Sequence, residues 1–123
     1  MQTGGEYRGW AVFWHDLSGR YGFADYPDIT KLMTLHKNAG CLCIDIPIGL
    51  PENRQQNVAR PDQKLRSRLP GKASSVFNTP CRQAVYARDK QTAKACNLQV
   101  LQKILSEQSL GFTPKIREVD QFL

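Results

Sequence analysis

The stretch Cys41–Pro51, CLCIDIPIGLP, decides the fold that the sequence predicts. Its first six residues are apolar except for Asp45, and such a run is typical of a strand covered on both faces in a parallel sheet. Pro47 lacks the N–H that a ladder needs, so the strand is expected to stop at about Ile46. The sequence therefore predicts a buried strand that carries one carboxylate to the end of a sheet.

The segment before this strand predicts an antiparallel hairpin followed by a helix. Trp10–Trp14 (WAVFW) and Tyr21–Tyr26 (YGFADY) are rich in strand-forming residues, and Ser18-Gly19 between them is a turn signal. Asp28 can cap a helix predicted over residues 28–39, which then leads into the Cys41 strand. This order of elements is typical of the α/β class.

The segment after Pro51 predicts several helices. The polar and basic stretch 52–73 is expected to be helical over Asp62–Leu69. Thr79-Pro80 predicts a helix that runs to about Ala95, because proline is favoured at the first helical position. Two more helices are expected, Leu98–Leu110 closed by Gly111, and a last one after Pro114 that buries Ile116, Val119 and Leu123.

Composition and charge limit the class of protein. The chain has 123 residues, enough for one hydrophobic core, and no apolar run approaches the ~20 residues of a membrane span. The N-terminal sequence lacks the apolar region of a signal peptide, so we expect a cytoplasmic protein with no membrane partner. The four cysteines lack the spacing of a zinc site and are expected to be reduced thiols.

The net charge of +6 is concentrated in one part of the chain. Residues 1–50 hold four basic and five acidic side chains, whereas residues 51–123 hold thirteen basic and six acidic ones. A basic half is expected in a protein that binds a polyanion such as nucleic acid, although ordinary solvated surfaces also carry such charge.

Three acidic residues are candidates for chemistry. Asp45 comes first, because a carboxylate on a buried strand costs several kcal/mol unless it is paired or binds a metal. The alternative is that it caps the PIGLP loop or pairs with an arginine. Glu118 and Asp120 lie two residues apart, so on a helix they point about 200° apart and only one can face the same site. The alternative for them is a solvated helix surface.

Ser74, Ser75 and Arg82 form a second candidate group. Small hydroxyls before a helix N-terminus can cradle an anion, and an arginine can add a bidentate phosphate contact. Serines in a turn and a surface arginine are the simpler alternative. His36 falls on the apolar face of the predicted helix 28–39 and is expected to be a partly buried structural residue. The sequence has neither a GxSxG elbow nor a GxxxxGK[ST] phosphate loop.

Four blocks in a fixed order carry a family resemblance. They are DIPIGLP at 45–51, Arg60-x-Asp62-x-x-x-Arg66, SSVF at 74–77 followed by Pro80 and Arg82, and PKIREVD at 114–120. The series resembles the family called domain of unknown function 429, a large group of prokaryotic proteins described as predicted nucleases with a ribonuclease H-like fold. The resemblance covers nearly the whole chain, from about Gly9 to Leu123.

The resemblance implies one ribonuclease H-like domain over residues 1–123, matching the N-terminal half to two-thirds of a family member. It implies a metal-dependent nuclease that holds Mg²⁺ or Mn²⁺ on carboxylates, with Asp45 and Glu118 as catalytic residues and Asp120 as a further metal ligand. The residues expected at nucleic-acid phosphates are Arg60, Arg66, Ser74, Ser75, Arg82 and Arg117.

The chain departs from the family pattern at both ends. The family usually opens with Gly-x-Asp-Gly, and here Gly4 or Gly5 stands where the aspartate is expected, with Glu6 nearby. Family members are roughly twice as long, and their final strands and a His-Pro-Glu segment have no counterpart before Leu123. We therefore expect a short or truncated member whose sheet is incomplete, with an open edge that favours a homodimer.

Three hypotheses follow for the function. The first is a metal-dependent nuclease that cleaves DNA or RNA. The second is a non-catalytic relative that binds nucleic acid through its basic half, with an affinity that falls as salt rises. The third is a structural chain that is completed by a second copy of itself.

Overall fold

The computed structural model describes residues 9–123, which form two compact units. The first, called here the hairpin unit, reaches to Ile44, and the second, called the helical unit, runs from Asp45 to Gln121. The sequence predicts that Gly4 or Gly5 stands where the family has its first aspartate, with Glu6 nearby. These positions lie outside the described residues. Across the described range the protein is a mixed α/β chain with one two-stranded sheet.

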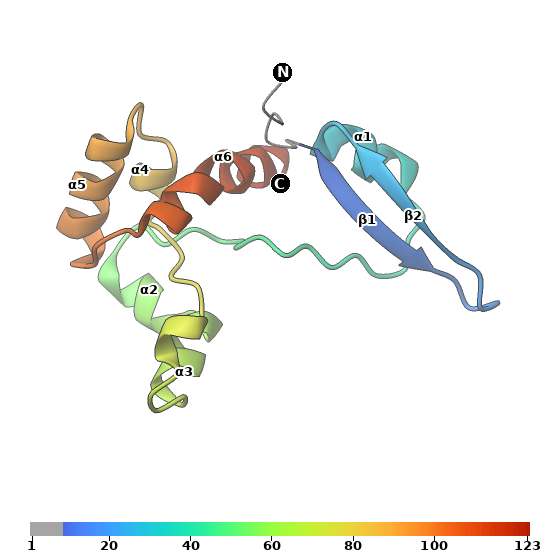
Figure 1. The fold of residues 1–123 in the computed structure, drawn as a ribbon. Coiled ribbons are helices and arrows are strands. Elements are labelled where there is room, and N and C mark those ends of the chain that lie inside the picture. Colours follow the sequence, from blue (N-terminus) through green and yellow to red (C-terminus); the bar gives the residue numbers. More distant parts are fainter. Residues whose placement is uncertain (1–8) are drawn as a thin grey trace, which may run out of the picture. The chain divides into compact units, whose positions relative to one another are not determined.

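The hairpin unit begins with the antiparallel pair that the sequence predicted. Strand β1 spans Trp10–His15 and strand β2 spans Tyr21–Tyr26, and they lie side by side in Figure 1. Their register pairs Phe13 with Phe23. Apolar and aromatic residues on both strands favour extended backbone, and the short connection between them fixes the register.

The hairpin turn is built around Asp16 and Gly19. The Gly19 N–H donates to the Asp16 carbonyl over 3.1 Å, and Gly19 has a φ of +85°, which a residue with a side chain rarely adopts. This is a three-residue loop of the type that ends in a left-handed glycine. The Asp16 carboxylate accepts from the N–H groups of Ser18 and Arg20, and its hydrogen bond from the Ser18 hydroxyl lowers its pKa.

Helix α1, Ile29–Leu35, follows the hairpin and confirms the predicted helix. The Asp28 carboxylate accepts from the Lys31 N–H over 2.8 Å and so caps the first turn. Ile29 and Leu32 are buried. His36 ends the helix half-buried, with its Nε2 atom 2.8 Å from the Tyr26 hydroxyl, which confirms its structural role.

The predicted buried strand over Cys41–Ile46 is wrong. This segment has no regular secondary structure, and the side chains of Cys41, Leu42, Cys43 and Asp45 are exposed. The physical reason is that an apolar run becomes a strand only when another strand pairs with its backbone. Within residues 9–123 only β1 and β2 pair with each other. Ile44 and Ile46 are half-buried, and Ile46 packs against the cluster of Leu50, Val85 and Ile116.

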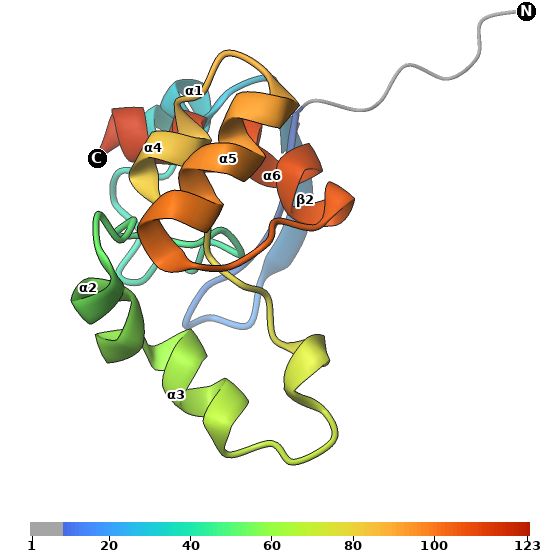
Figure 2. The same cartoon turned by 90° about the vertical axis from the view of Figure 1, so that its left-hand side faces the viewer.

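The helical unit contains six short or medium elements joined by loops. In chain order they are α2 (Arg54–Ala59), α3 (Pro61–Ser67), the 3-10 turn η1 (Ala73–Ser75), α4 (Arg82–Val85), α5 (Lys90–Leu101) and α6 (Glu107–Phe122). Helix α3 confirms the helix predicted near Asp62–Leu69. Figure 2 looks onto α4 and α5, with α6 behind them. None of the described helices is long and apolar enough to cross a bilayer.

The core of the helical unit lies between its last three helices. One cluster joins α4, α5, α6 and the loop before α6 through Cys81, Ala84, Ala93, Leu101, Leu105 and Leu110. A second joins the PIGLP loop to α4 and α6 through Leu50, Val85 and Ile116. Ile116 and Val119 are buried as predicted, whereas Leu123 is exposed.

Two predicted helix boundaries in this unit are wrong. The helix expected from Thr79-Pro80 to Ala95 is interrupted after α4, and α5 starts afresh where Asp89 accepts from the Thr92 N–H over 2.7 Å. The helix expected over Leu98–Leu110 is interrupted as well, because Gln102 adopts a left-handed conformation that ends α5. The Asp89 side-chain cap decides the first boundary, and the left-handed backbone of Gln102 decides the second.

Helix α6 also passes through Gly111 and Pro114, where the sequence predicted a break. Proline leaves the carbonyl four residues earlier without its usual N–H donor. Here that carbonyl belongs to Leu110, and the Thr113 hydroxyl donates to it over 2.8 Å. A neighbouring side chain therefore satisfies the acceptor that proline leaves open, and the helix continues.

The Asn97 side chain on α5 joins the residue before α4 to the loop after α5. Its side chain is almost fully buried, with 1% exposed. Its Oδ1 atom accepts from the Cys81 N–H over 2.8 Å, and its Nδ2 atom donates to the Lys103 carbonyl over 2.9 Å. One side chain thus supplies both backbone groups with a hydrogen-bond partner inside the core.

Candidate functional site

The predicted acidic residues lie in different surroundings. Asp45 is exposed on the irregular segment, and its carboxylate has no hydrogen bond or ion pair within residues 9–123. Glu118 is half-buried on α6 and pairs with Lys115 over 3.1 Å. Asp120 lies two residues further along the same helix. Its carboxylate accepts from the Arg82 guanidinium over 2.5 Å and from the Tyr86 hydroxyl over 2.6 Å.

These carboxylates do not form a metal centre. No three His, Cys, Asp or Glu side chains within the described range lie together as ligands of one ion would. Asp120 is already neutralised by a guanidinium, and a pair of metal ions needs several carboxylates that converge. The described residues therefore do not fit the Mg²⁺ or Mn²⁺ site that the family resemblance implies, and no catalytic step follows from them.

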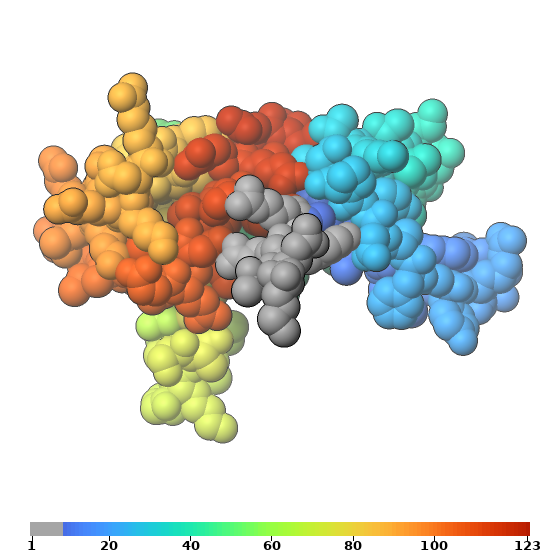
Figure 3. Space-filling model, turned by 45° about the horizontal axis from the view of Figure 1, so that its top comes forward, coloured from blue at the N-terminus to red at the C-terminus, as the bar shows by residue number. Residues whose placement is uncertain are grey.

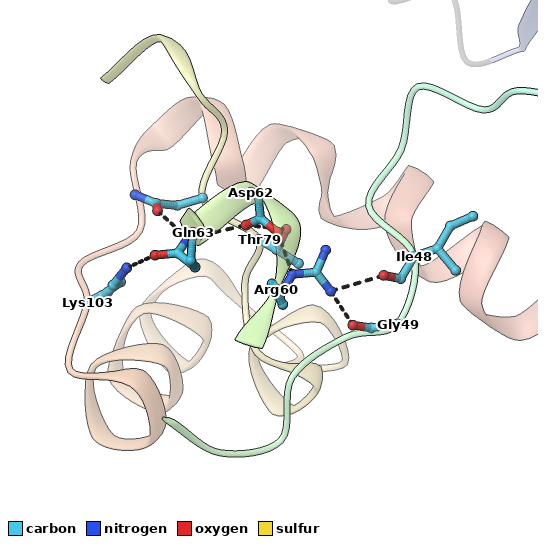
Figure 4. A network of polar contacts seen from close by, with 8 residues as sticks. Ile48, Gly49, Arg60, Asp62, Gln63, Thr79 and Lys103 are labelled. Carbon is cyan, nitrogen blue, oxygen red and sulfur yellow. Dashed lines mark hydrogen bonds and ion pairs between the residues drawn. The ribbon is translucent and has the colours of Figure 1, made fainter. Parts of the chain in front are cut away.

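Arg60 fixes the PIGLP loop rather than presenting its charge to solvent. It pairs with Asp62 over 2.8 Å, and it donates to the carbonyls of Ile48 and Gly49. Both side chains of the ion pair are largely buried, with 14% and 18% exposed. Figure 4 shows the guanidinium between the loop and α3. Gly49 turns the loop here through a φ of +70°, which a residue without a side chain adopts readily.

The Asp62 carboxylate continues this network toward the C-terminal helices. It accepts from Gln63 over 3.2 Å and from the Thr79 hydroxyl over 3.4 Å. The Gln63 side-chain nitrogen also donates to the Asn78 side-chain oxygen. The Gln63 side-chain oxygen accepts a hydrogen bond from the Lys103 ammonium (Figure 4). Burial lowers the pKa of Lys103, and the nearby Arg66 charge lowers it further. Polar side chains from three separate segments are held together here, and the family blocks contain only part of the set.

Two members of this network have no signal in the sequence. Gln63 and Lys103 lie forty positions apart and belong to no motif, so no spacing rule joins them. Asp62 was recognisable only as part of the Arg60-x-Asp62 block. Their meeting depends on where α3 packs, which is a property of the tertiary fold.

Most of the remaining predicted phosphate-binding residues are also engaged inside the protein. Arg66 donates to the Val76 carbonyl, and the Ser75 hydroxyl donates to the Lys72 carbonyl over 2.6 Å. Ser74 is exposed in η1. Arg117 donates to the Val85 carbonyl over 3.0 and 2.5 Å and lies 5.6 Å from the centre of the Tyr86 ring. These contacts hold loops and helix ends in place.

Arg82 joins three elements through two ion pairs. Its guanidinium contacts Glu52 over 3.0 Å and Asp120 over 2.5 Å. The bond to Asp120 raises the pKa of Arg82, and the bond from Tyr86 to the same carboxylate raises the pKa of Tyr86. Arg82 therefore belongs to an internal network that ties α4 to α6 and to the loop before α2, and its phosphate contact stays a prediction.

A different set of cations is exposed. Lys64 and Arg68 lie in or just after α3, and Lys72 precedes η1. All three are exposed, and none forms an ion pair with an acidic residue of the described range. Residues 60–72 hold five basic side chains against one acidic side chain, Asp62, which Arg60 already neutralises. Figure 3 shows the yellow-green part of this segment standing out from α5 and α6.

The comparison with family models supports the resemblance. The model described as "Protein of unknown function (DUF429)" matches residues 5–123. The chain belongs to this family. Neither the curated proteins nor the solved structures contain a match to it. Membership of the DUF429 family therefore accounts for the order of the four sequence blocks, and all four take part in internal contacts: Arg60 with the PIGLP loop, Arg66 with the SSVF segment, and Arg82 with the REVD helix.

Proposed function

We propose that this DUF429 chain binds nucleic acid through the phosphate backbone, using the exposed cations Lys64, Arg68 and Lys72. The observation that carries the proposal is that these three charges are exposed and free of acidic partners within the described residues. The other basic side chains of the same segment are held by carbonyls or carboxylates and would position it. A rigidly held segment with free cations is suited to a polyanion.

The proposal predicts a measurable salt dependence. Each phosphate that a lysine or arginine neutralises releases counterions, so the logarithm of the binding constant falls linearly with the logarithm of salt concentration. Three contacts on a single strand correspond to a slope of about −2. Binding to a labelled oligonucleotide is measured by fluorescence anisotropy across a series of salt concentrations.

Charge removal at matched places tests the site. The variant Lys64→Gln/Arg68→Gln/Lys72→Gln is expected to lose most of the salt dependence. The control Lys31→Gln/Lys37→Gln/Arg88→Gln removes the same charge from exposed positions elsewhere and is expected to keep it. Affinity that does not change with salt would overturn the proposal. An equal effect of both variants would show that net charge, and not this segment, governs binding.

Metal-dependent hydrolysis of DNA or RNA is the second candidate, as the family resemblance implies. What supports it is the family resemblance, because the exposed Asp45 carboxylate has no further acidic ligands gathered beside it within the described residues. This candidate includes the ribonuclease H-like fold, in which the hairpin and α1 would be the opening elements. It predicts cleavage with Mg²⁺ or Mn²⁺ that Asp45→Asn abolishes. Absence of cleavage on both DNA and RNA with either metal would exclude it.

A further inference from the structure

Two side chains of α3 contact the same stretch of chain inside the helical unit. The Gln63 side-chain nitrogen donates to the Asn78 side-chain oxygen over 3.1 Å, and the Arg66 guanidinium donates to the Val76 carbonyl. Residues three apart on a helix lie on one face. Gln63 and Arg66 therefore stand side by side against residues 76–78.

Lys103 reaches the same place from the loop after α5. Its ammonium donates to the Gln63 side-chain oxygen, as Figure 4 shows, while the nitrogen of the same amide donates to Asn78. The Gln63 amide therefore lies between Lys103 and Asn78. We call Gln63, Arg66, Asn78 and Lys103 together the Lys103 cluster.

The Lys103 cluster brings two positive charges together without an acidic partner of their own. Within residues 9–123, Arg66 and Lys103 form no ion pair, and their acceptors are a backbone carbonyl and an amide oxygen. Such neutral acceptors orient a cation but do not cancel its charge. The Asp62 carboxylate, which Gln63 also contacts, is already paired with Arg60 over 2.8 Å.

The surroundings of these two charges favour an anion between them. All four side chains of the Lys103 cluster are half-buried, so water hydrates the charges only in part while a small solute can still reach them. Partly dehydrated like charges destabilise each other unless an opposite charge stands close by. Burial and the Arg66 charge lower the pKa of Lys103, and the Asp62 carboxylate offsets this only in part.

We propose that the Lys103 cluster binds the oxygens of a phosphate group. Arg66 has N–H groups besides the one that the Val76 carbonyl accepts, and a guanidinium matches a phosphate in shape and charge. The Lys103 ammonium adds a second charge, and the Asn78 amide nitrogen adds a donor, since Gln63 occupies the oxygen of that amide. The inference goes beyond the proposed function, because it names a second phosphate site that inorganic phosphate alone can test.

Nuclear magnetic resonance of the isotope-labelled parent tests the site with inorganic phosphate. At constant ionic strength, phosphate is expected to shift the side-chain amide signals of Gln63 and Asn78 until they saturate, whereas chloride is not. Phosphate is also expected to raise the pKa of Lys103, followed through its Cε signal, because a nearby anion favours the charged ammonium. Shifts that chloride reproduces, or a Lys103 pKa that phosphate leaves unchanged, would overturn the inference.

Substitutions of Lys103 test the site a second time. Lys103→Gln removes the charge and is expected to weaken phosphate binding about tenfold or more, whereas Lys103→Arg keeps the charge and most of the affinity. The control Arg88→Gln removes an exposed charge from the same unit and is expected to bind phosphate like the parent. Far-UV circular dichroism checks that each variant is folded, and if Lys103→Gln is not, the titrations of the parent decide. Equal affinity of folded Lys103→Gln and the parent would overturn the inference, as would an equal loss in Arg88→Gln.

An oligonucleotide distinguishes the two sources of the phosphate group. If the group belongs to a nucleic-acid strand, Lys103→Gln lowers oligonucleotide affinity and inorganic phosphate competes with the strand. If it belongs to a small phosphate compound, Lys103→Gln loses phosphate binding and keeps oligonucleotide affinity. Absence of oligonucleotide binding would overturn the proposed function and leave this inference standing. Absence of phosphate binding would overturn this inference and leave the proposed function standing.

Discussion

The β1–β2 hairpin and the core between α4, α5 and α6 use their large side chains in opposite ways. The hairpin exposes Phe13, Tyr21 and Phe23, whereas the helical unit buries Leu101, Leu110 and Ile116 at 4% exposure or less. Its half-buried arginines are held by internal carbonyls and carboxylates. The arginines that look most like ligand-binding groups in the sequence therefore support the fold, while the hairpin rings contact one another and stay largely exposed.

The largest loss of stability is expected from a substitution of Asn97, in the core of the helical unit. Asn97→Ala leaves the buried Cys81 N–H and the Lys103 carbonyl without partners. Each unsatisfied group costs about 1–3 kcal/mol, so the free energy of unfolding is expected to fall by about 3 kcal/mol. Urea denaturation followed by far-UV circular dichroism measures the change. Gln99→Ala, at an exposed position of the same helix, is the control and is expected to change little.

Removal of Arg117 gives the next largest effect. Arg117→Met keeps much of the packing but loses the hydrogen bonds to the Val85 carbonyl, so we expect a loss of about 2 kcal/mol in unfolding free energy. Nucleic-acid affinity below the unfolding transition is expected to be unchanged. The exposed Arg88→Met is the matched control for stability. Weakened binding by a fully folded Arg117→Met protein would contradict the division between structural and exposed cations.

The elements that could be predicted from the sequence depend on local interactions. The hairpin follows from two strand-like runs around the Ser18-Gly19 turn, and α1 follows from the Asp28 cap and the spacing of Ile29 and Leu32. These signals act within a few residues, so the surrounding fold has little opportunity to override them.

The predictions that failed depend on partners far away in the sequence. The Cys41–Ile46 run is apolar enough for a strand, but a strand needs a neighbour with which to pair its backbone. Pro114 is a strong signal for the end of a helix. The helix continues because the Thr113 hydroxyl donates to the Leu110 carbonyl, in place of the N–H that proline lacks. For the candidate site, the sequence shows that Arg60 is charged and does not show that the Gly49 carbonyl holds it.

A smaller effect is expected inside the hairpin, where Gly22 lies beneath a tryptophan ring. A Cβ atom at Gly22 would stand 2.8–3.0 Å from the indole of Trp14, closer than van der Waals contact allows. Gly22→Ala must therefore displace the ring, at an expected cost of about 1 kcal/mol. Both tryptophans of the chain, Trp10 and Trp14, lie in β1, so their fluorescence reports on this unit.

The control for Gly22 is Gly40→Ala, because a Cβ atom at Gly40 meets nothing within 4 Å. It is expected to leave the tryptophan emission unchanged. An emission spectrum of Gly22→Ala identical to that of the parent would show that the close approach of the indole does not hold in solution. The hairpin would then be less ordered than the comparison of the two units assumes.

The smallest effect is a dependence of stability on pH that belongs to the helical unit. The hydrogen bond that Tyr86 donates to Asp120 raises the pKa of the Tyr86 phenol in the folded protein. The unfolded chain therefore releases this proton first, and the stabilisation is complete below the ordinary tyrosine pKa of about 10. It is lost as the pH rises through the higher pKa of the folded state.

Tyr86→Phe isolates this contribution, since it removes the titrating group and keeps the ring. Urea denaturation at a series of pH values is expected to show that the parent loses stability faster than Tyr86→Phe above about pH 10. The two curves should converge there, because the phenolate can no longer donate to Asp120 and repels its charge. Parallel curves would mean that the Arg82 ion pair alone holds Asp120, and that the network joining α4 to α6 does not depend on the phenol.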